Sequence, residues 1–299
     1  MNLKVNIAGV TFKNPITTAS GTFGSGAEFE EFVDLAALGA VTTKGVASKP
    51  WEGNPTPRIA ETYGGMLNAV GLQNPGIELF CKRDIPHLKE KGASIIVNVC
   101  GHSEKEYLEV VERLSDEPVD LLEINVSCPN VKEGGIAFGQ KPEALYRITR
   151  AVKAIARQPV VMKLSPNMTD ITEMARAAEA GGSDALSLIN TITGMKIDIH
   201  RRRFVLANRT GGLSGPAIKP VAVRMIYQVH KAVDLPIIGM GGVMTGEDAI
   251  ELMMAGASMV SVGTANFHDP AATMKILAGI KSFMEEYNIE DIHEIIGCM

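Results

Sequence analysis

The 299-residue chain has few cysteines, no excess of basic residues and no long hydrophobic run, and each shortage excludes a class of protein. Four cysteines do not make a disulfide framework in a chain of this length, and none forms a C-x-x-C pair typical of a zinc ribbon or an iron–sulfur cluster. A net charge of −5 argues against nucleic-acid binding, which usually needs a basic excess. The longest weakly polar stretch, Leu252 to Gly263, is too short to span a bilayer.

The composition is otherwise that of an ordinary globular protein, with 45% hydrophobic and 21% charged residues. No secretion signal is visible at the N-terminus, so a cytoplasmic location is expected. Glycine stands out with 30 residues, which occur in short clusters. Clustered glycine indicates places where the backbone approaches a ligand closely.

Short hydrophobic runs alternate with helical stretches along the whole chain. Leu3–Ile7 and Val10–Phe12 flank an Ala8-Gly9 turn and predict a hairpin. Eight βα units follow and indicate a (β/α)8 TIM barrel, one domain over residues 1–299, in preference to an open doubly wound sheet. The eight predicted strands, several of them nearly all apolar as strands buried on both faces should be, are Pro15–Ser20, Ala40–Lys44, Ala93–Val99, Asp120–Val126, Pro159–Ser165, Asp184–Thr191, Pro236–Gly242 and Ser258–Thr264.

Two connections, residues 46–92 after the second strand and 192–216 after the sixth, are too long for a plain crossover. Long loops in a compact domain are usually lids or binding loops. Both follow strands, so both are predicted to lie over the carboxyl end of the barrel, where barrel enzymes keep their chemistry.

Polar or glycine residues lie at or near the end of every predicted barrel strand, and they are expected to converge on one rim. Amides and lysines in such a hydrophobic context need hydrogen-bonding partners, which a ligand can supply. Glycine residues at the ends of the last two strands are typical of the phosphate cradle of barrels. Together they predict a phosphorylated ligand with a flat hydrogen-bonding group. The residues are Ser20, Lys44, Asn98, Asn125, Lys163, Asn190, Gly241, Gly242, Gly263 and Thr264.

The spacing of the residues does not match the motifs of other well-known ligand sites. The run Gly239–Gly242 lacks the third glycine of a dinucleotide fingerprint, and neither a Walker A run nor H-E-x-x-H is present. Cys128 is the exception among the thiols, because it follows the fourth strand in a loop over the barrel mouth. A thiol there can serve as a nucleophile or as a general base.

Five motifs in this order resemble the soluble class of dihydroorotate dehydrogenases: Thr43–Gly45, Asn68–Gly76, Asn125–Asn130, Gly211–Pro216 and Gly239–Gly242. The resemblance covers nearly the whole chain. It implies an FMN-containing barrel that oxidises dihydroorotate to orotate in pyrimidine biosynthesis. Gln73–Gly76 resembles the NAD-linked type, whose catalytic chain pairs with a subunit that carries FAD and a [2Fe-2S] cluster, in a heterotetramer of two plus two. The fumarate-using homodimer is the alternative.

The resemblance also implies roles for single residues. Cys128 is the expected base, and no metal is expected. The expected substrate contacts are Lys44, Asn68, Ala69, Val70, Gly71, Leu72, Asn125, Asn190 and Thr191. The expected FMN contacts are Ser20, Lys44, Gly45, Asn98, Asn125, Lys163, Ile189, Gly215, Gly241, Gly242, Gly263 and Thr264.

Two further classes stay open on the residues alone. A Schiff-base lyase barrel could use Lys163 as its strand-borne amine. A non-catalytic barrel could bind a phosphorylated ligand without turnover.

Overall fold

The computed structural model describes residues 1–127 and 139–299. Its centre is a sheet of eight parallel strands in the order β3-β16-β15-β10-β9-β8-β7-β4. The sheet closes into a barrel where Thr17 of β3 bridges Ala40, and the Thr17 and Thr42 hydroxyls form a 2.9 Å hydrogen bond. The predicted TIM barrel is therefore confirmed. Its strands are β3 (Ile16–Thr18), β4 (Val41–Thr42), β7 (Ile95–Val99), β8 (Leu121–Asn125), β9 (Val160–Lys163), β10 (Ala185–Leu188), β15 (Ile237–Met240) and β16 (Met259–Val262).

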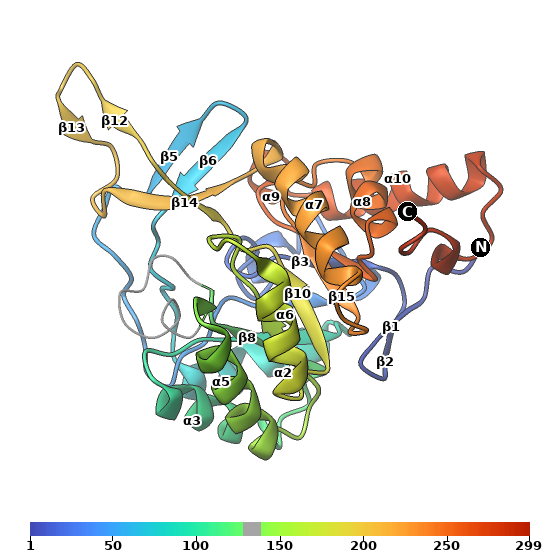
Figure 1. Cartoon of the computed structure of the whole chain (residues 1–299), viewed down its shortest axis with the longest axis horizontal. Coiled ribbons are helices and arrows are strands. Elements are labelled where there is room, and N and C mark those ends of the chain that lie inside the picture. The colour runs from blue at the N-terminus through green and yellow to red at the C-terminus, as the bar shows by residue number, and fades with distance from the viewer. Residues whose placement is uncertain (128–138) are drawn as a thin grey trace.

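Helices surround the barrel, with their apolar faces against the strands (Figure 1). Asp170 caps α6 by accepting from the Thr172 N–H, and Thr245 and Asp248 form a capping box on α8. The α-helices are α1 (Ile77–Leu79), α2 (Ile85–Glu90), α3 (Glu104–Leu114), α5 (Pro142–Ile155), α6 (Ile171–Ala180), α7 (Lys219–His230), α8 (Gly246–Met254), α9 (Ala265–His268) and α10 (Ala272–Glu286). Short 3-10 turns occupy Ala27–Phe29, Leu35–Ala37, Pro216–Ile218 and Ile292–Glu294, and a π-turn occupies Phe80–Asp84.

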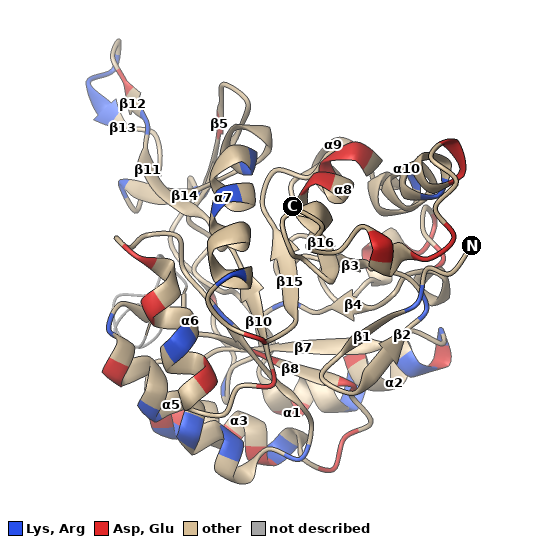
Figure 2. Cartoon of the chain, turned by 45° about the vertical axis from the view of Figure 1, so that its right-hand side comes forward, with Lys and Arg blue, Asp and Glu red and all other residues tan. Residues whose placement is uncertain are grey.

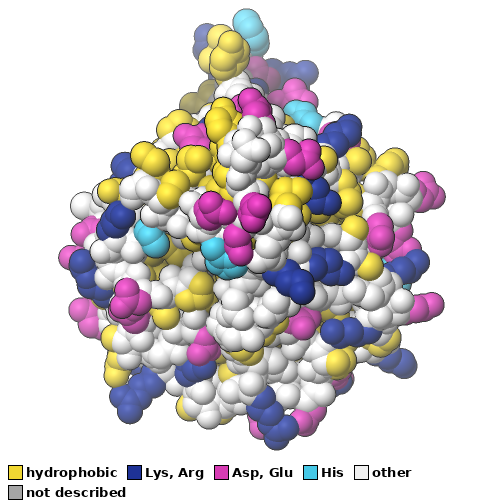
Figure 3. All heavy atoms as spheres, turned by 90° about the vertical axis from the view of Figure 1, so that its right-hand side faces the viewer, with side chains coloured by type: hydrophobic (Ala, Val, Ile, Leu, Met, Phe, Trp, Pro, Cys, Tyr) yellow, Lys and Arg dark blue, Asp and Glu magenta, His cyan; other side chains and the backbone are white. Residues whose placement is uncertain are grey.

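The distribution of charged and buried residues matches this arrangement, with strands inside and helices outside. Every residue of β7 and β8 is buried, as strands covered on both faces require. Charged side chains concentrate on the outer helices, and the barrel strands are largely free of them (Figure 2). Acidic and basic side chains are interspersed over the face shown in Figure 3. None of the helices in the described ranges is both long and apolar enough to cross a bilayer.

The two long connections meet each other above the barrel. β5 (Ile59–Thr62) and β6 (Gly65–Asn68) come from the first, and β11 (Ile192–Met195) and β14 (Thr210–Ser214) come from the second. They form one antiparallel sheet in the order β11-β14-β6-β5, with Asn68 opposite Gly212. A smaller hairpin, β12 (Ile197–Asp198) and β13 (Arg203–Phe204), projects beyond it (Figure 1). The predicted N-terminal hairpin is also confirmed, as β1 (Val5–Ile7) and β2 (Val10–Phe12).

Candidate functional site

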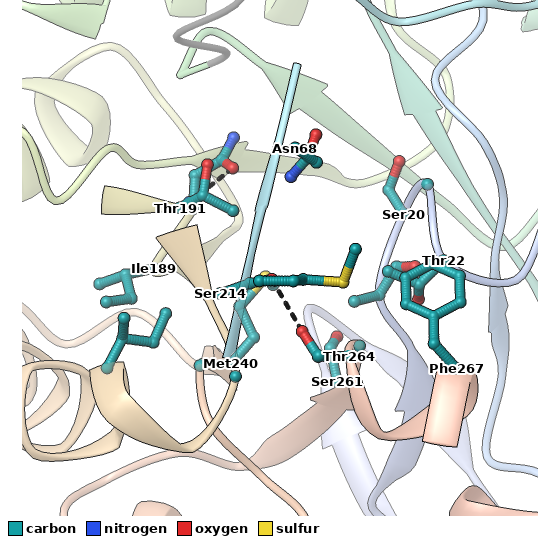
Figure 4. Close-up of a pocket in the computed structure, with 18 of the residues that line it drawn as sticks. Ser20, Thr22, Asn68, Ile189, Thr191, Ser214, Met240, Ser261, Thr264 and Phe267 are labelled. Carbon is teal, nitrogen blue, oxygen red and sulfur yellow. Dashed lines mark hydrogen bonds between the residues drawn. The ribbon is translucent and has the colours of Figure 1, made fainter. Parts of the chain in front are cut away.

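A cavity opens between the carboxyl ends of the barrel strands and the sheet above them (Figure 4). Its volume is about 1180 Å³ including the open mouth. Cofactor and substrate sites usually combine apolar walls with a few polar groups, and this cavity has both. The cavity gathers most of the sequence-predicted site residues, namely Ser20, Lys44, Asn68, Val70, Gly71, Leu72, Asn125, Lys163, Ile189, Asn190, Thr191, Gly215, Gly241, Gly242, Gly263 and Thr264.

Three predicted residues lie behind the wall of this cavity. Asn98 is fully buried, and its side-chain oxygen accepts from Asn125, which does line the cavity. Gly45 packs on Asn98, because a Cβ at Gly45 would lie 2.9 Å from the Asn98 oxygen. Ala69 is buried, with its carbonyl turned to Asn54. Cys128 lies outside the described residues.

Apolar and hydroxyl side chains of the wall were missed by the sequence reasoning. Some stand next to motif glycines, which was an available signal: Ser214 precedes Gly215, and Met66 follows the Gly64-Gly65 pair. Ile59 and Phe267 gave no comparable signal, because an isolated hydrophobic residue is normally assigned to the core. The missed residues include Thr22, Ile59, Met66, Ser214, Ile218, Met240, Val243, Met244, Ser261 and Phe267.

One end of the cavity carries a chain of amide side chains. The Asn190 Nδ2 group donates to the Ser127 hydroxyl at 2.8 Å and lies 3.5 Å from the Asn125 oxygen. The Asn190 oxygen accepts from the Thr191 N–H at 2.7 Å. On β8, the Asn125 carbonyl accepts from the buried Tyr107 hydroxyl at 2.7 Å. These bonds fix the amide planes, so the site is preorganised for a flat ligand that displays both donors and acceptors.

A buried ion pair lies beneath these amides. The Lys163 ammonium is 3.1 Å from Glu123 Oε1, and the two side chains are only 5% and 1% exposed. The same Oε1 accepts from Asn98 Nδ2 at 2.5 Å. A buried carboxylate needs such partners, since an unpaired charge is costly in a low-dielectric interior. The pair therefore holds a fixed cation at the floor of the cavity. Sequence reasoning did not select Glu123, although a carboxylate within the run Leu121–Asn125 was a visible signal.

The ends of β15 and β16 form a backbone cradle. Gly241 and Gly242 have φ angles of 126° and 79°, which side-chain-bearing residues rarely adopt. A Cβ at Gly242 would lie 2.6 Å from the Cβ of Lys219. On β16, the Ser261 hydroxyl is buried and has no hydrogen-bond partner within the described residues, while Thr264 donates to Ser214 at 2.8 Å (Figure 4). Close-approach glycines and an available hydroxyl fit a bound phosphate group.

A charged clamp holds the turn that follows Gly242. The Lys219 ammonium is 2.6 Å from both Asp248 Oδ1 and Glu251 Oε2, and these bonds raise the pKa of Lys219. Burial raises the pKa of Asp248. Its hydrogen bonds from Lys219 and from the N–H groups of Met244 and Thr245 outweigh burial and leave that pKa below its ordinary value. The turn is thus fixed mainly by an ionised Asp248.

Comparisons with known proteins agree with this geometry. A family model described as "Dihydroorotate dehydrogenase" matches residues 2–284. The catalytic subunit of dihydroorotate dehydrogenase B (NAD(+)) from Lachnoclostridium phytofermentans is 67% identical over the whole of both chains. That of Alkaliphilus oremlandii is 64% identical over 99% of this chain and 98% of its own. Among solved structures, Eimeria tenella DHODH in complex with ferulenol superposes with a TM-score of 0.84 at 26% identity, covering 99% of this chain and 88% of that one.

Proposed function

The chain belongs to the dihydroorotate dehydrogenase family, and we propose that it is the catalytic subunit of an NAD-linked enzyme. It is an oxidoreductase that converts dihydroorotate to orotate in pyrimidine biosynthesis. The observation that carries the NAD-linked assignment is the 67% identity, over both full lengths, to a catalytic subunit of that type. A partner subunit with FAD and a [2Fe-2S] cluster completes the enzyme, as two copies of each chain, in the cytoplasm.

The cavity suits FMN in this chain. Gly241, Gly242, Gly263 and Thr264 would hold the phosphate, because their backbone forms the cradle at the ends of β15 and β16. Bound FMN supplies the acceptor for the hydride that leaves C6 of dihydroorotate. Ser20, Ile189 and Gly215 would line the ring system and the ribityl chain.

The remaining polar groups would serve the substrate. Asn68, Asn125, Asn190 and Thr191 offer the paired donors and acceptors that a pyrimidine edge needs. Lys44 also lines the cavity, and Lys163 would supply a fixed cation to stabilise the negative charge that develops during hydride transfer. Cys128 would take the C5 proton. The Schiff-base alternative needs a neutral amine, whereas Lys163 is paired with the Glu123 carboxylate.

Assays of the purified chain test this proposal. The chain should be yellow and, without oxygen, should be bleached by dihydroorotate. It should then reduce an artificial dye rapidly but NAD poorly, because its own residues offer no dinucleotide fingerprint. Adding the FAD and iron–sulfur subunit should restore NAD reduction. Rapid fumarate-dependent turnover, or rapid NAD reduction by the chain alone, would show that the NAD-linked assignment is wrong.

A further inference from the structure

The segment from Ala69 to Leu72 forms part of the cavity wall, and Asn54 lies behind it. The backbone N–H of Asn54 donates to the Val70 carbonyl at 2.9 Å. Its side-chain Nδ2 donates to the Ala69 carbonyl at 3.0 Å. Val70 and Gly71 line the cavity and Asn54 does not. Asn54 therefore binds two successive carbonyls on the side of the segment away from the cavity.

This arrangement determines where two backbone N–H groups point. In a trans peptide the N–H is directed opposite to the carbonyl of the same unit, and both peptide units here are trans. Because the carbonyls of Ala69 and Val70 face Asn54, the N–H groups of Val70 and Gly71 face the cavity. Neither N–H donates to another described residue. Two donors are thus presented to a ligand.

The backbone conformation of the segment is also unusual. Gly71 and Leu72 have φ angles of 78° and 55°, so two successive residues are left-handed. A Cβ at Gly71 would lie 2.7 Å from Asn54 Cγ and 2.8 Å from its backbone N, so the segment rests directly on Asn54. A left-handed Leu72 costs energy and needs such support.

Asn54 is itself held from behind. The Arg58 guanidinium donates to the carbonyl of Asn54, to that of Glu52 at 2.9 Å and to the Gln73 side chain at 2.8 Å. The carbonyl of Arg58 accepts from the Ala69 N–H at 2.7 Å. The support is therefore a connected network, and Asn54 is the member that touches the cavity segment on two carbonyls.

We propose that Asn54 is a positioning residue that aims the Val70 and Gly71 N–H groups at the carboxylate of dihydroorotate and orotate. This inference rests on the proposed function, which supplies the ligand. Asparagine suits the task because its amide donates to the Ala69 carbonyl. Aspartate has the same shape, but it would set an oxygen against that carbonyl and add negative charge behind an anion site.

The test compares Asn54→Asp with Asn54→Ala in the FMN-loaded chain, using calorimetric titration with orotate and with uracil, which lacks the carboxylate. Asn54→Asp should weaken orotate binding roughly 10- to 100-fold, the range for hydrogen bonds to a charged group. Uracil affinity and FMN content should change less than about twofold, and the KM for dihydroorotate should rise more than kcat falls. Asn54→Ala should show a smaller loss of the same kind, because it keeps the backbone donor.

The matched control is Asn6→Asp on the N-terminal hairpin, an exposed position that should leave both affinities unchanged. Wild-type orotate affinity in Asn54→Asp would overturn the proposal. So would a parallel loss of orotate, uracil and FMN in both Asn54 variants, because that result would give Asn54 a general structural role. Failure of dihydroorotate to bleach the wild-type chain counts against the proposed function, and this arm is read separately from the calorimetry.

Discussion

The buried pair of Lys163 and Glu123 makes a quantitative prediction possible. Both hydrogen bonds that reach Glu123 go to the same oxygen, Oε1, from Lys163 and from Asn98. Glu123→Gln can therefore keep both bonds and remove only the charge. Lys163→Met removes the cation and leaves the carboxylate buried with Asn98 alone. Each single change leaves one charge without its counterion in a site that is at most 5% exposed, so solvent screening is weak.

Removing one partner of a buried pair costs about 3–5 kcal/mol, whereas removing both charges together is often nearly neutral. In a domain of this size each kcal/mol corresponds to roughly 2–4 °C of melting temperature. Lys163→Met should thus lower the melting temperature by about 6–20 °C, and the double variant with Glu123→Gln should recover most of that loss. The cofactor-free chain is used, so that FMN binding does not add to the measurement.

Thermal unfolding followed by circular dichroism measures the melting temperatures of the two single variants and of the double variant. The matched control is Lys153→Met, which breaks a 2.6 Å pair with Asp184 in which both side chains are about 30% exposed. That variant should lose no more than about 1 kcal/mol. If the two single changes at Lys163 and Glu123 proved additive in the double variant, the coupling inferred from their geometry would be refuted.

Three further predictions concern the site. Cys128→Ala should keep FMN and orotate binding but slow flavin reduction by roughly 10²–10⁴-fold, as expected for loss of a general base; undiminished single-turnover reduction would reassign the base. Cys81→Ala is its control and should leave the reduction rate unchanged, because burial raises the pKa of the Cys81 thiol to about 12 and keeps it protonated. Asp248→Asn should destabilise the chain by about 1–2 kcal/mol at neutral pH. Since the folded-state pKa of Asp248 is depressed, its contribution is present above the unfolded pKa of about 3.9 and is lost as pH falls through the folded value. The difference in melting temperature between the two proteins should therefore begin to shrink only as the pH falls below about 4 and should close below the folded-state pKa; a difference that stayed constant as the pH fell further would contradict this. Gly242→Ala must place a Cβ against Lys219 at a φ of 79°, so FMN affinity measured by fluorescence titration should fall at least about fivefold; unchanged affinity would remove Gly242 from the cradle.

The barrel itself was predictable because its signals are local. Each strand is a short hydrophobic run, and the capping residues Asp170 and Thr245 mark helix starts. The sheet above the barrel was not predictable in the same way. Its central pairing joins Asn68 to Gly212, which lie far apart in the sequence. The partner strand Thr210–Ser214 has two glycines, so its composition gives no strand signal.

How far each polar residue lies below the rim of the barrel was harder to predict from the sequence. The strand register explains why. The sequence pattern predicted that the last polar residues of all the strands form one rim. The observed register sets Asn98 opposite Glu123 and Asn125 opposite Lys163, so residues near the ends of adjacent strands lie in different layers. Side chains two residues apart on a strand share a face, which places Glu123 one layer below Asn125. The Lys163 side chain is long enough to reach from the upper layer to Glu123 in the lower one. The Lys163 ammonium at the cavity floor is therefore anchored by Glu123, which does not itself line the cavity. Only the strand pairing reveals the layer to which Glu123 belongs.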